Sequence, residues 1–171
     1  MSKKTLIASF IFGLAVICAQ PKSLSAATPT LTGVWNLVFE PTSPNVLPNI
    51  PGLATFSADG TLQETDGAEA APGSINAGTI TTYGTPGHGH WEAFPSGTGF
   101  FILFDSLNVN SDATLNSRRT TQAAVTVSAG TGGAATLSGT YTTTVAMPDG
   151  GGTVTQSGNI KGNFVPAPAL P

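Results

Sequence analysis

Alternation of side-chain character is the feature that most restricts how this chain can fold. From Ala135 to Met147 every second residue except Thr143 is apolar or small, and threonine or serine fills almost every position between them. The segment from Val154 to Phe164 carries a similar alternation. Because successive side chains of a β-strand point to opposite faces, this period of two predicts strands with one buried side and one solvent-facing side.

Six further segments of the same kind precede these two. The spacing of apolar residues that is typical of helices is absent, and threonine, glycine and serine, which are poor helix-interior residues, dominate. Asp59-Gly60 predicts a two-residue hairpin turn, because both positions accept a positive φ. The six expected strands are Leu31–Glu40, Leu53–Ala58, Thr61–Thr65, Gly87–Phe94, Gly99–Val109 and Thr121–Ser128.

Eight antiparallel strands joined by short turns can close on themselves, which removes the exposed edges that promote aggregation. Threonine suits the wet face of such a wall, because it favours strands without needing a charge. We therefore predict an all-β domain, a single antiparallel and mostly up-and-down eight-stranded β-barrel. A two-sheet β-sandwich is the alternative that satisfies the same pattern.

The first 27 residues have the pattern of a secretory signal peptide. Lys3 and Lys4 give a positive start, and the apolar run Leu6–Ala19 is too short to cross a membrane as a helix. Small residues at Ser25 and Ala27 favour cleavage after Ala27. We expect a secreted or periplasmic protein with no stable membrane insertion after this cleavage.

Residues 28–171 are the expected mature chain, which is long enough for one domain and ends in a proline-rich tail at 166–171. The single cysteine, Cys18, lies in the leader, so no disulfide is expected. Charged residues make up only 9% of the chain, and three of its six basic residues lie in the first 22 positions. Nucleic-acid binding needs a clustered basic surface, so this composition argues against nucleic acid as a partner.

Four short motifs resemble those of small secreted bacterial barrels. Gly33-Val34-Trp35 looks like the G-x-W that opens lipocalin-type barrels, and residues 55–61, 89–92 and 104–106 are similar to recurrent segments of bacterial barrels of the lipocalin or allene oxide cyclase type. The spacing of eight strands over the mature chain is also similar. This resemblance implies a cavity for a small apolar molecule.

The segment Phe100–Phe104 is apolar on both faces. Alternate residues of a strand in a barrel wall face outward, so either three or two of these five apolar side chains are exposed to solvent. Each exposed phenylalanine loses about 1.5–3 kcal/mol of the stabilisation that its burial would give. The chain's own loops can cover this face, and so can a second copy of the chain, since large apolar patches mark interfaces. A homo-oligomer through this strand is therefore the second interpretation.

His88, His90 and Glu92 share one face of their expected strand. Two imidazoles and a carboxylate suit zinc, copper or iron when a further group converges on the ion. The alternative places Trp91 in the core and both histidines in solvent. We expect no cofactor, and these three residues are only weak candidates for a metal site.

Asp105 and Tyr141 are the weak candidates for acid–base catalysis. Parity places Tyr141 on the inner face, and an inward Asp105 would be desolvated and have a raised pKa. The alternative is that Asp105 ends its strand and caps the next turn. No G-x-S-x-G elbow, P-loop or H-E-x-x-H motif is present, which argues against nucleophilic hydrolysis and phosphate chemistry.

These patterns lead to three hypotheses about function. The first is a secreted barrel that binds a small hydrophobic molecule in its interior. The second is a cofactor-free isomerase or cyclase of the allene oxide cyclase type, and the third is a structural or interaction domain with a filled core. The residues expected to contact a ligand are Trp35, Phe39, Phe56, Trp91, Phe101, Leu103 and Tyr141.

Overall fold

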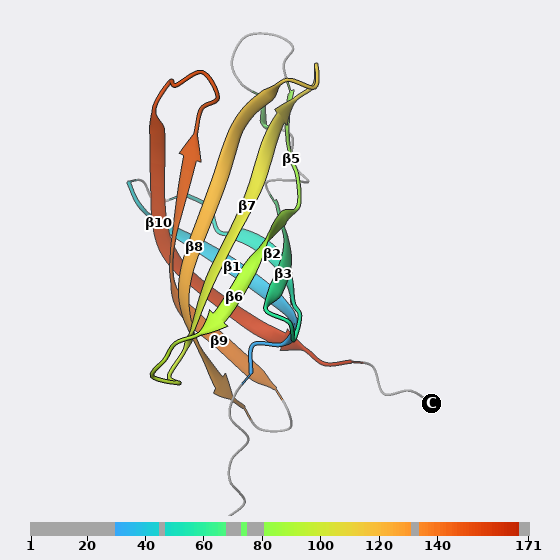
Figure 1. The fold of residues 1–171 in the computed structure, drawn as a ribbon, viewed down its shortest axis with the longest axis vertical. Helices are drawn as coiled ribbons and strands as arrows, with labels where there is room; N and C mark the ends of the chain where they lie inside the picture. Colours follow the sequence, from blue (N-terminus) through green and yellow to red (C-terminus); the bar gives the residue numbers. More distant parts are fainter. Residues whose placement is uncertain (1–29, 45–46, 68–72, 75–80, 131–133, 168–171) are drawn as a thin grey trace, which may run out of the picture.

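The computed structural model describes residues 30–44, 47–67, 73–74, 81–130 and 134–167, and these form ten β-strands (Figure 1). The expected leader, residues 1–27, lies outside this part of the chain. No helix long and apolar enough to cross a membrane occurs among the described residues. The strands are β1 (Gly33–Ser43), β2 (Ile50–Phe56), β3 (Thr61–Asp66), β4 (Gly73–Ser74), β5 (Thr81–Gly84), β6 (Gly87–Ala93), β7 (Phe100–Asn110), β8 (Leu115–Ala129), β9 (Ala135–Ala146) and β10 (Thr153–Val165).

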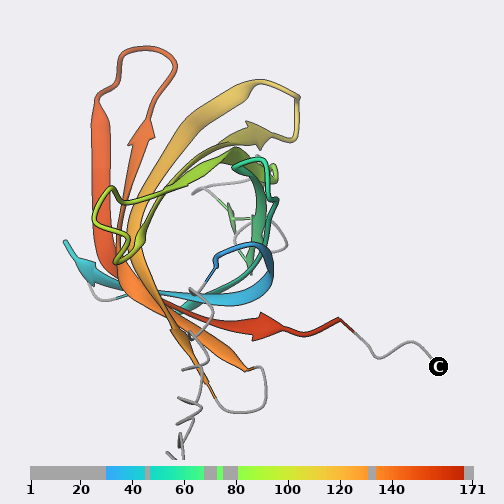
Figure 2. The same ribbon diagram turned by 60° about the horizontal axis from the view of Figure 1, so that its bottom comes forward.

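Eight of these strands close into an antiparallel barrel. The order around the wall is β1, β2, β3, β6, β7, β8, β9 and β10, and β10 pairs again with β1. The pairing of β7 with β8 joins the two ends of what would otherwise be an open sheet. Figure 2 shows the strands encircling a common axis. The predicted eight-stranded barrel is confirmed, and the sandwich alternative is not adopted.

Strands β4 and β5 are additions that the alternation pattern did not predict. β6 pairs with the first half of β7, whereas β5 pairs with the far end of β7 at Asn108–Asn110. Thr85 and Pro86 separate β5 from β6, and proline has no N–H to continue the ladder. The Thr85 N–H donates to the Leu107 carbonyl at 2.8 Å, so β5 and β6 follow one edge of β7 as an interrupted strand.

The turn between β2 and β3 differs from the expected two-residue hairpin. The Ser57 N–H donates to the Thr61 carbonyl at 2.9 Å, which leaves three residues between this pair. Gly60 has a φ of 88°, a conformation that glycine adopts at little cost. The Asp59 side chain accepts from the Thr61 N–H at 2.9 Å and fixes the turn.

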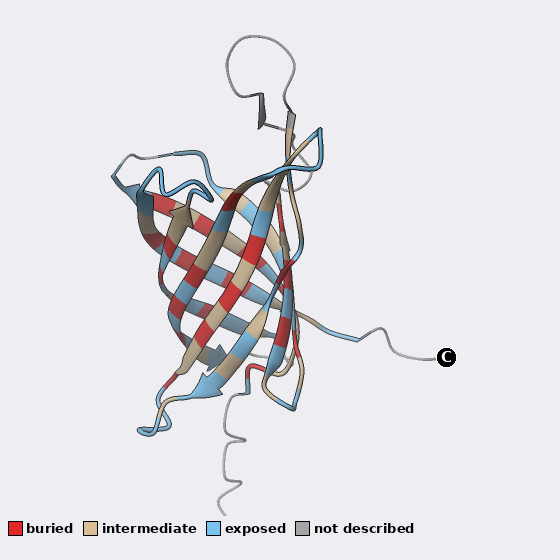
Figure 3. Cartoon of the chain, turned by 45° about the horizontal axis from the view of Figure 1, so that its top comes forward, coloured by how far each residue is buried: buried red, intermediate tan, exposed pale blue. Residues whose placement is uncertain are grey.

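Buried and exposed residues alternate along the barrel strands (Figure 3). One end of the interior, which we call the apolar end, is filled by hydrocarbon and aromatic side chains. Trp35 is fully buried there, and its indole N–H donates to the carbonyl of Leu31, also fully buried, at 2.8 Å. Phe164 lies edge-on to Trp35 with the ring centroids 5.5 Å apart. The segment that precedes β1 therefore packs against Trp35 at this end of the barrel.

We expect Trp35→Ala to reduce the free energy of unfolding by about 3–5 kcal/mol, because it leaves a large cavity and removes the hydrogen bond to Leu31. Urea denaturation followed by circular dichroism measures the change. Leu53→Ala is the matched control, because Leu53 is half-exposed. A loss for Trp35→Ala no larger than that for Leu53→Ala would contradict the proposed packing of the apolar end.

Candidate functional site

The opposite end of the barrel interior carries polar side chains, and we call it the polar end. Direct cross-strand partners share a face, so the register can be followed around the wall. Gln156 of β10 lies opposite Thr143 of β9, and Thr143 lies opposite Thr121 of β8. The Thr121 and Thr143 hydroxyls hydrogen bond to each other at 2.8 Å and are buried. Three neighbouring strands thus contribute a row of polar groups to the interior.

An ion pair joins two walls of the polar end. Asp66 is the last residue of β3, and Arg119 lies on β8, which is not a neighbour of β3 in the sheet. Arg119 Nη2 donates to Asp66 Oδ2 at 3.0 Å, and the two side chains are 16% and 5% exposed. Removing one partner from a pair this well buried leaves an uncompensated charge, which is strongly destabilising.

Tyr141 of β9 is buried, and its hydroxyl has no hydrogen-bond partner among the described residues. Its ring lies edge-on to Phe39 with the centroids 5.2 Å apart. Burial raises the pKa of the Tyr141 phenol above its ordinary value of 10.0, and the positive charge of Arg119 opposes this shift. At neutral pH the hydroxyl is therefore protonated and can act as a hydrogen-bond donor.

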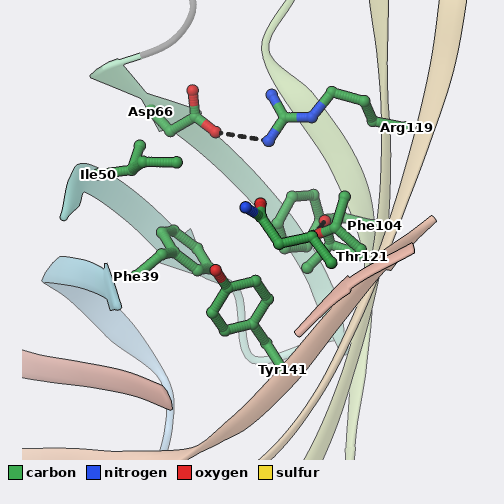
Figure 4. A pocket seen from close by; sticks show the side chains of 9 residues that line it. Phe39, Ile50, Asp66, Phe104, Arg119, Thr121 and Tyr141 are labelled. Atoms are coloured by element: carbon green, nitrogen blue, oxygen red, sulfur yellow. Dashed lines mark hydrogen bonds and ion pairs between the residues drawn. The ribbon is translucent and has the colours of Figure 1, made fainter. Parts of the chain in front are cut away.

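These side chains surround a small cavity (Figure 4). Its volume is about 10 Å³, which is room for about one water molecule. Figure 4 shows the Tyr141 hydroxyl pointing into this space, with the ion pair of Asp66 and Arg119 on the far side. The lining residues are Phe39, Ile50, Asp66, Phe104, Arg119, Thr121, Tyr141, Thr143 and Gln156.

A second buried carboxyl group, that of Glu64, lies next to this cavity. Glu64 precedes Asp66 by two residues and shares its face of β3. A Cβ atom on Gly52 would stand 3.0 Å from Glu64 Oε1, and one on Gly87 would stand 3.1 Å from Oε2. The two glycines leave room for this carboxyl group beside Phe39 and Phe104.

Five of the seven expected ligand-contacting residues lie inside the barrel. Trp35 and Phe56 belong to the buried core, and Phe39 and Tyr141 reach the cavity. Trp91 is partly buried and packs against that core, and its indole N–H donates to the Ser57 carbonyl at 3.0 Å. The structure brings only Phe39 and Tyr141 of this set to the polar end.

Phe101 and Leu103 lie on the outer face of β7, so the expectation that they face the interior is corrected. Their neighbours Ile102 and Phe104 are buried inside, and alternation sends Phe101 and Leu103 outward. Phe101 borders a shallow groove of about 190 Å³ on the outer wall. Association of two copies through this strand remains a prediction.

Asp105 also lies on the outer face, so the hypothesis of an inward Asp105 is wrong. It pairs with Arg118 and accepts a hydrogen bond from Thr120. The hydrogen bond from Arg118 lowers the pKa of Asp105 below its ordinary value, the reverse of the increase expected for an inward position. The capping alternative is also wrong, because β7 continues to Asn110.

His88, His90 and Glu92 share a face of β6 and are all exposed, while Trp91 points to the core. No group of three or more potential metal-ligating side chains lies together in the described segments. A metal at these three residues needs a further ligand from outside those segments or from another molecule.

Sequence reasoning missed Arg119, Asp66 and the polar row as parts of one site. The available signal was the pair Arg118-Arg119, because adjacent residues on a strand face opposite sides and one of the two must point inward. The structure gives that position to Arg119. Comparisons with protein-family models, curated proteins and solved structures found no match.

We expect Asp66→Asn to lower the free energy of unfolding by about 3–5 kcal/mol, because it leaves the Arg119 charge buried without its partner. Asp105→Asn is the matched control, since its pair with Arg118 lies on the exposed outer wall and should contribute far less. Urea denaturation of both variants at neutral pH measures the difference. Equal losses in the two variants would show that the Asp66 pair is not buried.

We expect the phenol of Tyr141 to ionise above pH 10.0. The chain has two tyrosines, so Tyr83→Phe leaves Tyr141 as the only phenol, and ultraviolet absorbance follows its titration. The unfolded phenol ionises more easily than the buried one, so stability contributed by burial is present below pH 10.0 and falls as the pH rises above it. Ionisation at or below pH 10.0 in the folded protein would contradict the buried position.

Proposed function

We propose that this protein is a secreted barrel that binds a small, largely apolar molecule at the polar end of its interior. The observation that supports this most is the buried Tyr141 hydroxyl, which has no partner among the described residues and points into a cavity beside a buried ion pair. Binding pockets typically combine an apolar lining with a few well-placed polar groups. Phe39, Ile50 and Phe104 supply such a lining here.

The contrast between the two ends supports this choice over a purely structural domain. At the apolar end the core is filled by hydrocarbon and aromatic groups, which is what stability alone favours. At the polar end the chain buries an ion pair, whose net contribution to stability is small or unfavourable compared with apolar residues of similar volume. A polar cluster that folding does not need is a candidate for function.

The size of the cavity limits what enters it. With room for about one water molecule, it takes one polar atom of a ligand, and the rest of the ligand must lie at the mouth. Val145 lies directly across from Arg119 and Val154 directly across from Val145, so these two valines continue the inner face beyond the ion pair. Val154 is 56% exposed and can cover an apolar body there.

The architecture is also consistent with the resemblance to lipocalin-type and allene oxide cyclase-type barrels. An eight-stranded antiparallel barrel whose first strand begins with Gly33-Val34-Trp35 is the arrangement that this resemblance implies. In this proposal the leader directs the chain out of the cytoplasm, and the mature barrel holds its ligand there without a cofactor.

A cofactor-free isomerase is the second candidate, and one observation favours it. Asp66 and the protonated Tyr141 line the same cavity, so a carboxylate and a phenol are available to a molecule bound there. Isomerisation of an unsaturated epoxide breaks a carbon–oxygen bond and forms a new bond within the same molecule, with no oxidant or reductant. Recovery of a rearranged product by chromatography supports this candidate, and recovery of unchanged epoxide at the uncatalysed rate contradicts it.

Binding can be tested by nuclear magnetic resonance of the isotope-labelled mature chain with two probes, methyl octanoate and octanoate. We expect at least one probe to shift the signals of Arg119, Tyr141 and Val145, because the first two line the cavity and Val145 is the cross-strand partner of Arg119. His90 and Lys161, which lie on the outer wall, are the internal controls and should not shift. No shift at the polar end with either probe, or shifts confined to the outer wall, would contradict the proposed function.

A further inference from the structure

We infer that the ligand of the polar end is an uncharged molecule whose polar group is a single acceptor oxygen, such as the carbonyl of an ester, ketone or lactone. This inference rests on the proposed function and specifies the chemistry of the ligand. It follows from three properties of the cavity: its donors, its size and the charges around it.

Two side chains that line the cavity, Tyr141 and Arg119, carry hydrogen-bond donors. The Tyr141 hydroxyl has no partner in the described part of the chain and is protonated at neutral pH. Arg119 has only donor nitrogens, and its Nη2 donates the hydrogen bond to Asp66. Thr121 and Thr143 already hydrogen bond to each other. A ligand atom that lies between Tyr141 and Arg119 can therefore accept hydrogen bonds from both.

The volume restricts this acceptor to one oxygen atom. A cavity of about 10 Å³ accommodates one water-sized group. A carbonyl oxygen can take the place of a water molecule and accept from both Tyr141 and Arg119, which preserves the hydrogen bonds that the water would make. An ester, a ketone and a carboxylate can each place one oxygen here, so the choice among them rests on charge.

The charges at the polar end also disfavour an anion. Arg119 is already paired with Asp66, and Glu64 is buried two residues before Asp66 on the same face of β3. An anionic ligand would place a second carboxylate beside a guanidinium group that Asp66 already neutralises, and like charges in close contact in a buried site are costly. A neutral carbonyl oxygen accepts hydrogen bonds from Tyr141 and Arg119 without this repulsion.

The orientation of the ligand follows from the register. Its carbonyl lies against Tyr141, and its apolar body extends toward Val145, the cross-strand partner of Arg119, and Val154, the partner of Val145. Specificity for an acceptor then depends on the phenol, because a site built around a buried donor rejects molecules that leave the donor unpaired.

The test compares the affinities of methyl octanoate and octanoate for the folded mature chain and for two variants, by isothermal titration calorimetry. We expect the ester to bind about tenfold or more tightly than the carboxylate. Tyr141→Phe should weaken ester binding by about fivefold to tenfold, the effect of one hydrogen bond. Tyr83→Phe is the matched control, because Tyr83 is half-exposed, and it should bind as the unaltered chain does.

Tyr141→Phe removes an unpartnered hydroxyl and keeps the ring that contacts Phe39, so the variant should fold. Octanoate binding as tightly as the ester, or an unchanged ester affinity in Tyr141→Phe, would overturn the inference while leaving binding at the polar end intact. Absence of binding by both probes would overturn the proposed function and this inference together.

Discussion

The pairing of β7 with β8 closes the sheet, and the site described above depends on that closure. Without it the inward side chains of β7 would line an exposed sheet edge, and Arg119 would face solvent instead of Asp66. The register across this seam sets Phe104 opposite Thr121 and Ser106 opposite Arg119. Both strands therefore change from apolar to polar inward residues at the same level, and the interior acquires two chemically different ends.

The apolar end contributes mainly to stability, and the polar end carries the proposed function. Trp35, Leu137 and Val125 are almost completely buried at or near the apolar end, where burial contributes to folding. At the polar end, Asp66, Arg119 and Tyr141 are held in a defined arrangement at some cost to stability, because buried polar groups need partners. The filled end supplies the rigidity that keeps the donors of the other end directed at one small space.

The alternation pattern was sufficient to predict the barrel, because inner and outer faces differ clearly along β9 and β10. It failed where the inward side chains are polar: β8 begins at Leu115, whereas the expected strand begins at Thr121, because the inward side chains before it include Ser117 and Arg119. It was also ambiguous in Phe100–Phe104. Both faces of this segment are apolar, so the alternation of side chains does not show which face points into the barrel.

The candidate site was harder to predict than the fold, for a physical reason. Asp66 and Arg119 are separated by 53 residues and lie on strands that are not adjacent, so only the closed barrel brings them together. Tyr141 could be placed inside from its own strand, because its neighbours on both sides alternate regularly. A local pattern thus predicts which way one side chain points, but not which distant side chain it meets.

The central claim is that the Tyr141 hydroxyl and Arg119 donate into one small cavity at the polar end. A high-resolution crystal structure of the mature chain tests this most directly. The account predicts density for one oxygen atom, from water or a bound molecule, within hydrogen-bonding distance of both Tyr141 Oη and an Arg119 nitrogen. A Tyr141 hydroxyl bonded to another side chain, with the space closed by the protein itself, would contradict it.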